Sequence, residues 1–458
     1  MLHRIYLTII LLLFTQTIFA HPTPTNTFIT LADIHFDPFV GCDQLPTPCP
    51  LLNELRITSP ASWNLIFQKY ADHIKTRYHR DTDYRLLQST LTELKTLNQQ
   101  QPTFILILGD FLAHQFPQQY KQYAVDTSEA AYQAFVKDVF IYLTDQFNQA
   151  APNTDIYPVI GNNDSYHDDY GMDPHGLFFK DLNSIFATFI KDHHNQEKFQ
   201  QAFANSGYYA VTLHHKKQRL IVLNSVLFSA LHQTPAMQKA AIEQLAWLEA
   251  QLNQAKQKHQ RVLLALHIPP GVDVYRSIKM HSVIIRYFWP PLFWQPSYNE
   301  QFLSLLQQYA TTIVGLLPAH IHSDAFQLFM NKADHSFIPL SITPSISPVF
   351  GNNPGIKVFS YDTQTFDLIN YDTYFYPLNE KKRAVWKHEY NFNAVYQPDC
   401  QACLLVNGMR RLTRGNALVT AYQTYYAVSQ DAQPITTTWM PYWCAIYHAD
   451  WASYKACL

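Results

Sequence analysis

Seven residues of three types, aspartate, asparagine and histidine, occur in five short groups along this chain of 458 residues and could bind metal ions. The seven are Asp33, His35, Asp110, Asn162, His267, His320 and His322. A mixed set of oxygen and nitrogen donors suits zinc, manganese or iron better than magnesium or calcium. No group is specific alone, because an Asp-x-His or Gly-Asp pair is common by chance and most of the 21 histidines must be structural or exposed. Their order and setting therefore decide whether they form a site.

Each group follows a short apolar segment that predicts a strand buried on both faces. These segments are residues 28–32, 104–108, 156–160, 261–266 and 312–316, and a further one covers residues 220–223. Segments with helical periodicity lie between them, over residues 84–97, 128–147 and 236–258. Alternating strands and helices predict an α/β fold with helices outside the sheet. Because the carboxyl ends of strands line the ligand crevice of open α/β sheets, we expect the seven side chains to converge there.

The order of the groups resembles the calcineurin-like metallophosphoesterase superfamily, whose pattern runs Asp-x-His, Gly-Asp, Gly-Asn-His, His and Gly-His-x-His. The resemblance covers residues 28–372. Finer matches are similar to its acid sphingomyelinase-like phosphodiesterase branch: residues 267–271 read His-Ile-Pro-Pro-Gly, residues 343–355 end in Asn-Asn-Pro-Gly, and His114 lies four positions after Asp110. This resemblance implies a layered α/β/β/α core with central β-sheets, which we expect over residues 21–374.

The resemblance also implies two metal sites that share one carboxylate. One site would be formed by Asp33, His35 and His322. The other would be formed by Asn162, His267 and His320. Asp110 would bridge them, and we expect two divalent ions, zinc in the first place, with manganese or iron as alternatives. Paired metals clamp a phosphoryl group and hold a hydroxide that attacks phosphorus in line.

Two positions depart from the family pattern, and Ala319, where the last motif usually carries Gly, is the lesser of them. Gly-Asn-His reads Gly-Asn-Asn here, so Asn163 stands where a histidine is often assigned to leaving-group protonation or transition-state binding. Asn163 can donate a hydrogen bond but cannot deliver a proton. His114 is then the candidate general acid, and contact with phosphate or support of a metal ligand are its alternative roles. Endopolyphosphatases resemble the same Gly-Asn-Asn-Asp motif, so the change is compatible with hydrolysis.

The N-terminus and the cysteines predict export. Residues 1–20 combine Arg4, an apolar run over residues 7–14 and a small residue at Ala20, which is the layout of a cleavable signal peptide. An uncleaved anchor is the alternative, but the run is short for a membrane span. We expect a secreted or periplasmic protein whose six cysteines form disulfides; fifteen pairings are open, and we favour the local ones. These join Cys42 with Cys49, Cys400 with Cys403, and Cys444 with Cys457.

Two further regions lie outside this pattern. Residues 375–458 are poor in glycine and rich in tyrosine and tryptophan, and they predict a small, mostly helical C-terminal region stapled by two of the cysteine pairs. Residues 283–294 form a dense aromatic stretch between two of the groups. Exposed aromatics there would contact a lipid surface or an apolar part of a substrate, and a buried helical turn is the alternative. The aromatic residues concerned are Phe288, Trp289, Phe293 and Trp294.

Composition narrows the function further. A formal net charge of -2 lacks the basic excess of a general nucleic-acid binder, and no Gly-x-Ser-x-Gly motif indicates a serine hydrolase. The leading hypothesis is a phosphodiesterase that acts outside the cytoplasm on a sphingomyelin-like phospholipid or a nucleotide-type phosphodiester. An endopolyphosphatase is the alternative with the same chemistry, although no Lys/Arg cluster for a polyanion is evident. A metal-stabilised binding protein without catalysis is the alternative of another class.

Overall fold

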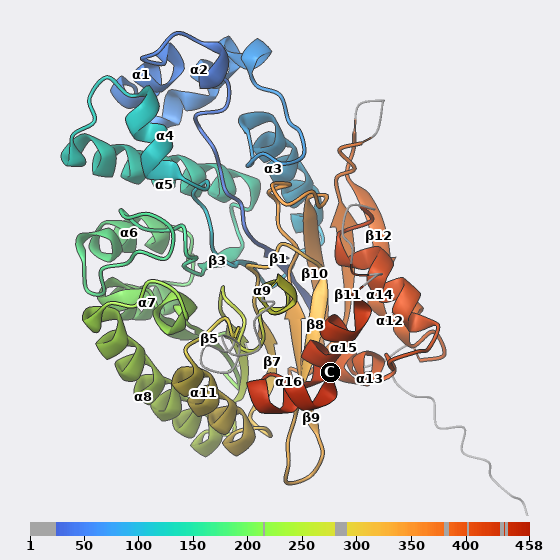
Figure 1. Cartoon of the computed structure of the whole chain (residues 1–458). Coiled ribbons are helices and arrows are strands. Elements are labelled where there is room, and N and C mark those ends of the chain that lie inside the picture. The colour runs from blue at the N-terminus through green and yellow to red at the C-terminus, as the bar shows by residue number, and fades with distance from the viewer. Residues whose placement is uncertain are drawn as a thin grey trace, which may run out of the picture.

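The computed structural model describes residues 24–213, 216–279, 291–379, 384–400, 403–430, 435 and 438–458, and within these ranges two six-stranded sheets form the centre of the chain (Figure 1). The first sheet has the strand order β12-β11-β10-β1-β2-β3. Its strands are β1 (Thr25–Leu31), β2 (Phe104–Ile107), β3 (Asp155–Pro158), β10 (Gly355–Asp362), β11 (Leu368–Phe375) and β12 (Lys387–Asn391). The second sheet has the order β4-β5-β6-β7-β9-β8. Its strands are β4 (Tyr209–Thr212), β5 (Gln218–Val222), β6 (Arg261–Ala265), β7 (Ile313–Leu317), β8 (Ala325–Met330) and β9 (Phe337–Ile342).

The strands that precede the five polar groups run parallel within each sheet. In the first sheet β1, β2 and β3 are parallel, with Ile29 opposite Ile105 and Phe104 opposite Asp155. In the second sheet β5, β6 and β7 are parallel. Every residue of β2, β3 and β7 is buried, as expected for strands with helices or a second sheet on both faces. The six predicted strands are therefore confirmed, and the carboxyl ends of the parallel strands gather at one edge of each sheet.

Helices lie outside the two sheets, so the α/β/β/α layering is confirmed (Figure 1). Within the described residues the helices of the first part of the chain are α1 (Pro50–Ile57), α2 (Trp63–Lys69), α3 (Tyr84–Asn98), α4 (Phe116–Tyr123), α5 (Glu129–Ala150), α6 (Leu177–Ala187), α7 (His193–Ser206), α8 (Pro235–Gln257), α9 (Val274–Lys279) and α11 (Pro296–Gln308). The predicted helices match α3, α5 and α8 to within three residues at each end. Side-chain caps explain where two of them begin: Asp83 accepts from the backbone N–H of Leu86, and Thr234 accepts from that of Met237.

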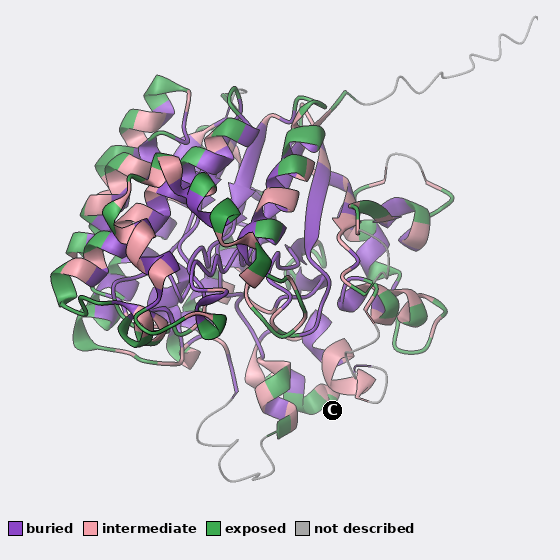
Figure 2. Ribbon diagram, turned by 90° about the horizontal axis from the view of Figure 1, so that it is seen from above, coloured by how far each residue is buried: buried purple, intermediate pink, exposed green. Residues whose placement is uncertain are grey.

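The core is shared by both sheets and the inner faces of the helices. Figure 2 shows buried residues along the strands and exposed residues on the outward faces of the helices. In α3 the leucines at positions 87, 91, 94 and 97 are all buried, which is the apolar stripe that the periodicity predicts. No helix within the described ranges is long and apolar enough to span a bilayer.

The C-terminal part is mostly helical, as predicted, but it also adds a strand. Its described helices are α12 (Phe392–Tyr396), α13 (Leu405–Arg410), α14 (Leu418–Tyr426), α15 (Trp439–Tyr447) and α16 (Trp451–Cys457). Strand β12 pairs antiparallel with β11 and so extends the first sheet. This part of the chain therefore shares a sheet with β1, the strand that leads into the first polar group.

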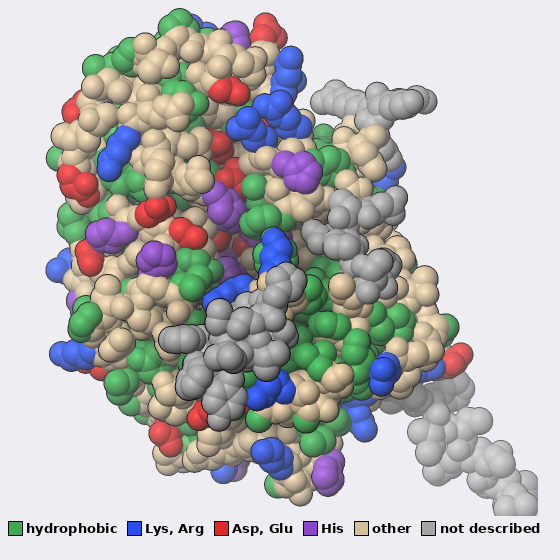
Figure 3. All heavy atoms as spheres, viewed as in Figure 1, with side chains coloured by type: hydrophobic (Ala, Val, Ile, Leu, Met, Phe, Trp, Pro, Cys, Tyr) green, Lys and Arg blue, Asp and Glu red, His purple; other side chains and the backbone are tan. Residues whose placement is uncertain are grey.

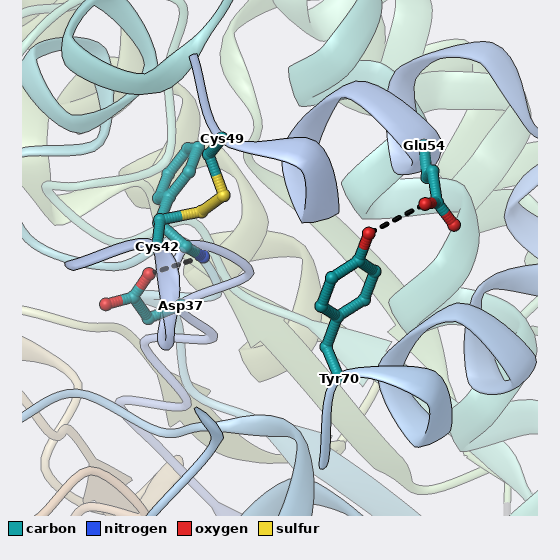
Figure 4. Close-up of a disulfide and its surroundings, with 6 residues drawn as sticks. Asp37, Cys42, Cys49, Glu54 and Tyr70 are labelled. Atoms are coloured by element: carbon teal, nitrogen blue, oxygen red, sulfur yellow. Dashed lines mark hydrogen bonds between the residues drawn. A yellow bond between two sulfur atoms is a disulfide. The ribbon is translucent and has the colours of Figure 1, made fainter. Parts of the chain in front are cut away.

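All three predicted disulfides are present. They join Cys42 to Cys49, Cys400 to Cys403 and Cys444 to Cys457. The first closes the loop between β1 and α1 and places Cys49 at the start of that helix (Figure 4). In the same loop the carboxylate of Asp37 accepts from the backbone N–H of Phe39. The last joins α15 to α16. The local pairing is therefore confirmed among the fifteen that six cysteines allow.

Candidate metal centre

The seven polar residues meet where the two sheets come together. From the first sheet, Asp33 and His35 follow β1, Asp110 follows β2 and Asn162 follows β3. From the second sheet, His267 follows β6, and His320 and His322 follow β7. Six of the seven side chains are buried and His320 is half-buried. Strand ends from both sheets thus place the seven side chains in one crevice, and Figure 3 shows histidine and acidic side chains beside hydrophobic ones on one face of the molecule.

One oxygen of Asp110 occupies the middle of the cluster. Its Oδ2 lies 3.3 Å from His35 Nε2 and 3.3 Å from His267 Nε2. On one side, His35 Nε2 lies 3.2 Å from His322 Nε2, which in turn lies 3.4 Å from Asp33 Oδ1. On the other side, His267 Nε2 lies 3.0 Å from Asn162 Oδ1. The cluster therefore has two halves that meet at one carboxylate.

The donor atoms of these residues fit divalent cations. Three sets have donor atoms within 4.8 Å of one another. The sets are Asp33 with His35 and Asp110, Asp110 with His267 and His320, and His35 with His114 and His322. Two buried atoms, Asp33 Oδ1 and His322 Nδ1, have no hydrogen-bond partner among the described residues. Buried polar atoms are costly to leave unpaired, so a cation bound to Asp33 Oδ1 would satisfy an atom that the protein does not.

Hydrogen bonds from the first sheet set the tautomers of two histidines. His35 Nδ1–H donates to the carbonyl of Leu112 at 2.9 Å, and His267 Nδ1–H donates to the carbonyl of Leu108 at 2.7 Å. Each ring is thereby turned so that Nε2 points to the cluster, as metal-binding histidines commonly are. Burial lowers the pKa of His35 to about 4, so this ring stays neutral and its Nε2 lone pair is free to bind a cation.

Asp110 and His267 shift each other's pKa in opposite directions. Burial alone would raise the pKa of Asp110, but His267 and His35 outweigh it and hold that pKa well below its usual range. Burial would lower the pKa of His267, but Asp110 outweighs it and raises the pKa to about 9. The site is therefore built around a buried negative charge that requires a positive partner.

Five of the seven residues have left-handed backbone conformations. Their φ angles are 48° for Asp33, 42° for His35, 55° for Asp110, 72° for His320 and 58° for His322. Such conformations cost roughly 1–3 kcal/mol each and cluster at functional sites. Gly109, with φ 92°, allows the close approach of the loops, because a Cβ there would lie 2.8 Å from both Gly161 N and His267 Nδ1. The chain bends sharply after each strand in order to aim these side chains inward.

Asn163, a predicted catalytic residue, holds Asp110. Its backbone N–H donates to Asp110 Oδ1 at 2.8 Å and its Nδ2 donates to Asp110 Oδ2 at 2.9 Å. The next residue, Asp164, accepts from the backbone N–H groups of Phe111 and Gly161 and so joins the loops after β2 and β3. Sequence reasoning gave Asp164 no role, although its place in the Gly-Asn-Asn-Asp motif could have pointed to one.

His114, the predicted general acid, lies at the edge of the cluster. Its ring stacks on that of His35 with centroids 4.0 Å apart, and its Nδ1 lies 3.0 Å from Asp81 Oδ1. The backbone N–H of His114 and the hydroxyl of Ser347 also donate to Asp81. Burial would lower the pKa of His114, but Asp81 outweighs it and raises the pKa to about 9. Asp81 lies in a loop before α3 with no recognisable motif, so sequence reasoning missed it.

Two further residues that the sequence did not indicate contact the cluster from one loop. Asp169 accepts from Asn162 Nδ2 at 2.7 Å, which turns Asn162 Oδ1 toward His267. The hydroxyl of Tyr170 lies 3.2 Å from His320 Nε2. Neither residue follows a strand directly, so neither belongs to the pattern from which the seven were found.

The prediction that Trp294 faces a lipid surface is wrong. Its side chain is fully buried, its Nε1–H donates to the carbonyl of Ile268, and its ring packs against Phe228. The alternative is correct in that this residue is buried, but Trp294 lies in an isolated β-bridge with Ser229 and not in a helical turn. Phe293 is partly buried and meets the ring of His320 edge-on with centroids 5.6 Å apart. Phe288 and Trp289 lie outside the described residues.

Two packed sheets whose strand ends carry a His/Asp/Asn cluster define a metal-dependent phosphoesterase. Residues 27–323 match the sequence model of the family described as calcineurin-like phosphoesterase, and residues 331–458 match the acid sphingomyelin phosphodiesterase C-terminal region. The chain belongs to the calcineurin-like phosphoesterase family. It is a metal-dependent phosphoric ester hydrolase, and its C-terminal part is similar to that of acid sphingomyelin phosphodiesterase.

Similar proteins span most of the chain. Acid sphingomyelinase-like phosphodiesterase 3b from Mus musculus is 26% identical, over 94% of this chain and 89% of its own length. Sphingomyelinase phosphodiesterase D from Dictyostelium discoideum is 27% identical, over 76% and 74% respectively. Cyclic GMP-AMP phosphodiesterase SMPDL3A from Homo sapiens is 24% identical, over 82% and 80%. The substrates in these names range from a phospholipid to a nucleotide.

Proposed function

We propose that this protein is a secreted phosphodiesterase that uses two divalent metal ions to hydrolyse a sphingomyelin-like or nucleotide-type phosphodiester. The observation that carries the proposal is the position of Asp110 Oδ2, 3.3 Å from a histidine nitrogen on either side. One carboxylate oxygen between two groups of nitrogen and oxygen donors is the arrangement that a pair of bridged metal ions requires.

The two halves of the cluster supply the two proposed sites. One ion would be bound by Asp33, His35 and His322. The other would be bound by Asn162, His267 and His320. Asp110 would contribute to both, and the mixed donors favour zinc, with manganese and iron as alternatives. When bound, two such ions activate water and offset the charge on the phosphoryl oxygens.

The chain's own residues position the substrate and handle the proton. Asp81 engages Nδ1 of His114, so the opposite ring nitrogen, Nε2, is the one that can donate to the leaving oxygen of the ester. Asn163 fixes the orientation of Asp110 through both of its N–H donors. His114 is thus proposed as the general acid, and Asn163 acts by positioning.

Export fits the covalent structure of the chain. Three disulfides within the described residues are typical of proteins that fold in an oxidising compartment. We propose that residues 1–20 act as a signal peptide and that the protein is secreted or periplasmic. The division into residues 21–374 and 375–458, and lipid contact through Phe288 and Trp289, stay predictions.

A substrate panel tests the proposal. Sphingomyelin, CDP-choline, ATP and polyphosphate are each incubated with protein loaded with zinc or with manganese, and with an Asp110→Asn control. We expect turnover of a diester that the control lacks. Hydrolysis of polyphosphate alone would instead support the endopolyphosphatase, which the Gly161–Asp164 motif favours. Activity on p-nitrophenyl phosphate, a phosphomonoester run beside the panel, and on none of the four substrates would overturn both functions.

A further inference from the structure

A pocket of about 480 Å³ opens beside the metal centre. One side is formed by the loops after β6 and β7 and by the start of α9. The other side is formed by the C-terminal helices α14 and α15. Seven Phe and Tyr residues from both sides line it: Tyr275, Phe293, Phe326, Phe350, Tyr422, Tyr426 and Tyr442. Sequence reasoning assigned the C-terminal helices no part in the site, yet they close this pocket.

The pocket begins where the metal cluster ends. His320 belongs to both, since it is one of the seven polar residues and also lines the pocket. The ring of Phe293 meets His320 edge-on, and the ring of Phe350 meets His322 edge-on with centroids 4.6 Å apart. A substrate whose phosphorus lies over the cluster would therefore direct one of its two ester arms past His320 into the pocket.

The far wall is a connected set of rings. Tyr422 packs edge-on against Phe326 with centroids 5.2 Å apart, and Tyr426 packs edge-on against Tyr442 at 5.4 Å. Tyr422 and Tyr426 themselves lie 6.0 Å apart on α14. Aromatic walls with few polar groups bind ligands mainly by removing apolar surface from water.

The charges in the pocket argue against an anionic arm. None of the residues that line it is Lys or Arg, and besides His320 the one ionisable acid or base other than tyrosine is Asp273. Asp273 accepts from the backbone N–H of Arg276 at 2.9 Å, and its Oδ2 lies 3.9 Å from Arg276 Nε. An anionic arm, such as further phosphates, would meet a carboxylate and no cation among these lining residues.

We propose that this pocket binds an uncharged, largely apolar ester arm of the substrate, and that the tyrosines of α14 and α15 determine which arm is accepted. The proposal rests on the phosphodiesterase function proposed above. An aliphatic chain and an aromatic ring share this chemistry, because both bury apolar surface against the same rings. The C-terminal region is then part of substrate recognition in addition to its role in the first sheet.

Matched substrates test the pocket separately from the chemistry. We would compare p-nitrophenyl phosphodiesters whose second arm is methyl, hexyl, phenyl or carboxyhexyl, using the metal-loaded full chain. The pocket predicts that kcat/KM for the hexyl or the phenyl substrate exceeds that for the methyl substrate by at least about 10-fold, the lower range for a hydrophobic pocket. Which of the two is preferred distinguishes a chain from a ring. The carboxyhexyl substrate should lose the advantage.

Substitution of Tyr442 tests whether the preference for an apolar arm arises in this pocket. In Tyr442→Ala the ratio of kcat/KM for the preferred arm to that for methyl should fall severalfold, whereas Tyr447→Ala, on the same helix but outside the pocket lining, should leave the ratio unchanged. Tyr442→Lys should raise the relative rate with the carboxyhexyl arm. Thermal unfolding of each variant checks that it is folded.

Two results would contradict the proposal, and they differ in what they leave standing. A wild-type ratio near one, or a ratio unaffected by both Tyr442 substitutions, would overturn the pocket while leaving the phosphodiesterase function intact. Absence of turnover with every diester, the methyl one included, would instead overturn the proposed function and the pocket's role with it.

Discussion

The two sheets contribute different chemistry to the crevice and hold it in different ways. The first sheet supplies both carboxylates and the amide, and the second supplies three of the four histidines among the seven residues. On the first side, Asp110 accepts from Asn163 and Asn162 donates to Asp169. On the second side, the histidines are oriented largely by groups of the first. The loops of the first sheet therefore set the geometry, and the second sheet completes it.

The contrast is clearest in the histidines that follow β6 and β7. His267 donates to the carbonyl of Leu108, which follows β2 of the first sheet, and His320 contacts Tyr170. His322 Nδ1 has no partner among the described residues. Side chains that are held by the opposite sheet are in place only when the sheets are packed together. Metal binding should thus depend on the correct packing of the two sheets against each other.

Asp110→Asn should weaken metal binding in both halves of the cluster and give the largest loss of activity. The substitution removes the buried charge at the one oxygen that lies 3.3 Å from a histidine on each side. We expect activity to fall by more than about 100-fold, beyond the range for residues that only orient a ligand. Elemental analysis should show fewer than two metal ions per chain.

The control for this variant is Asp145→Asn, at an exposed position of α5. It changes the net charge equally and should keep the activity and the metal content of the wild type. Two bound ions and a nearly normal rate in Asp110→Asn would show that Asp110 does not bridge the halves.

His114→Gln should slow the reaction by about 100-fold for substrates with a poor leaving group, the lower range for general acid catalysis. The effect should be much smaller for a p-nitrophenyl ester, whose leaving group needs little protonation. Metal content should be unchanged, because His114 is proposed to act on the leaving oxygen. Kinetics on an alkyl diester and a p-nitrophenyl diester, together with elemental analysis, check this.

Asp81→Asn serves as the matched comparison for His114. It keeps the ring in place but weakens the charge-assisted contact of 3.0 Å at Nδ1, so an intermediate loss is expected. Equal losses for both leaving groups, or loss of a metal ion in His114→Gln, would assign His114 to metal binding.

Asp169→Asn should weaken one half of the cluster more than the other. The amide has one acceptor oxygen in place of two and no charge, so it fixes Asn162 with its oxygen toward His267 less firmly than the carboxylate does. We expect the affinity for one of two metal ions to fall by about 10-fold. This is the lower end of the range for residues that support a metal ligand, because Asp169 is itself exposed. Calorimetric metal titration should resolve it, with Asp168→Asn as the neighbouring control. Equal weakening of both ions would contradict the division into halves.

The strands and the seven residues could be predicted because both depend on local sequence. Apolar runs identify strands, helical periodicity identifies helices, and the groups at strand ends follow from the geometry of parallel sheets. The local disulfides follow from short separations along the chain. These features need no knowledge of how distant segments pack.

The supporting residues depend on packing and therefore escaped prediction. Asp81 reaches His114 across a separation of 33 residues, and Tyr170 reaches His320 across 150. Trp294 lies in an aromatic run that suits an exposed or a buried position equally, and only its contacts with Phe228 and Ile268 decide between them. Which loop lies against which strand end is settled by tertiary contacts that periodicity does not encode.

Tyr170→Phe should give the smallest effect and is the most direct test of the contrast between the sheets. It removes a single hydroxyl that lies 3.2 Å from His320 Nε2, on a histidine of the second sheet that is already half-buried beside Phe293. One hydrogen bond contributes about 0.5–1.5 kcal/mol, so a loss of about 2- to 3-fold in metal affinity is expected, at the lower end of that range. If the first sheet sets the geometry, this loss must be smaller than that of Asp169→Asn when both are measured by the same titration. A larger loss in Tyr170→Phe would mean that the histidines of the second sheet are held as firmly as the residues of the first sheet. The two sheets would then organise their side chains independently.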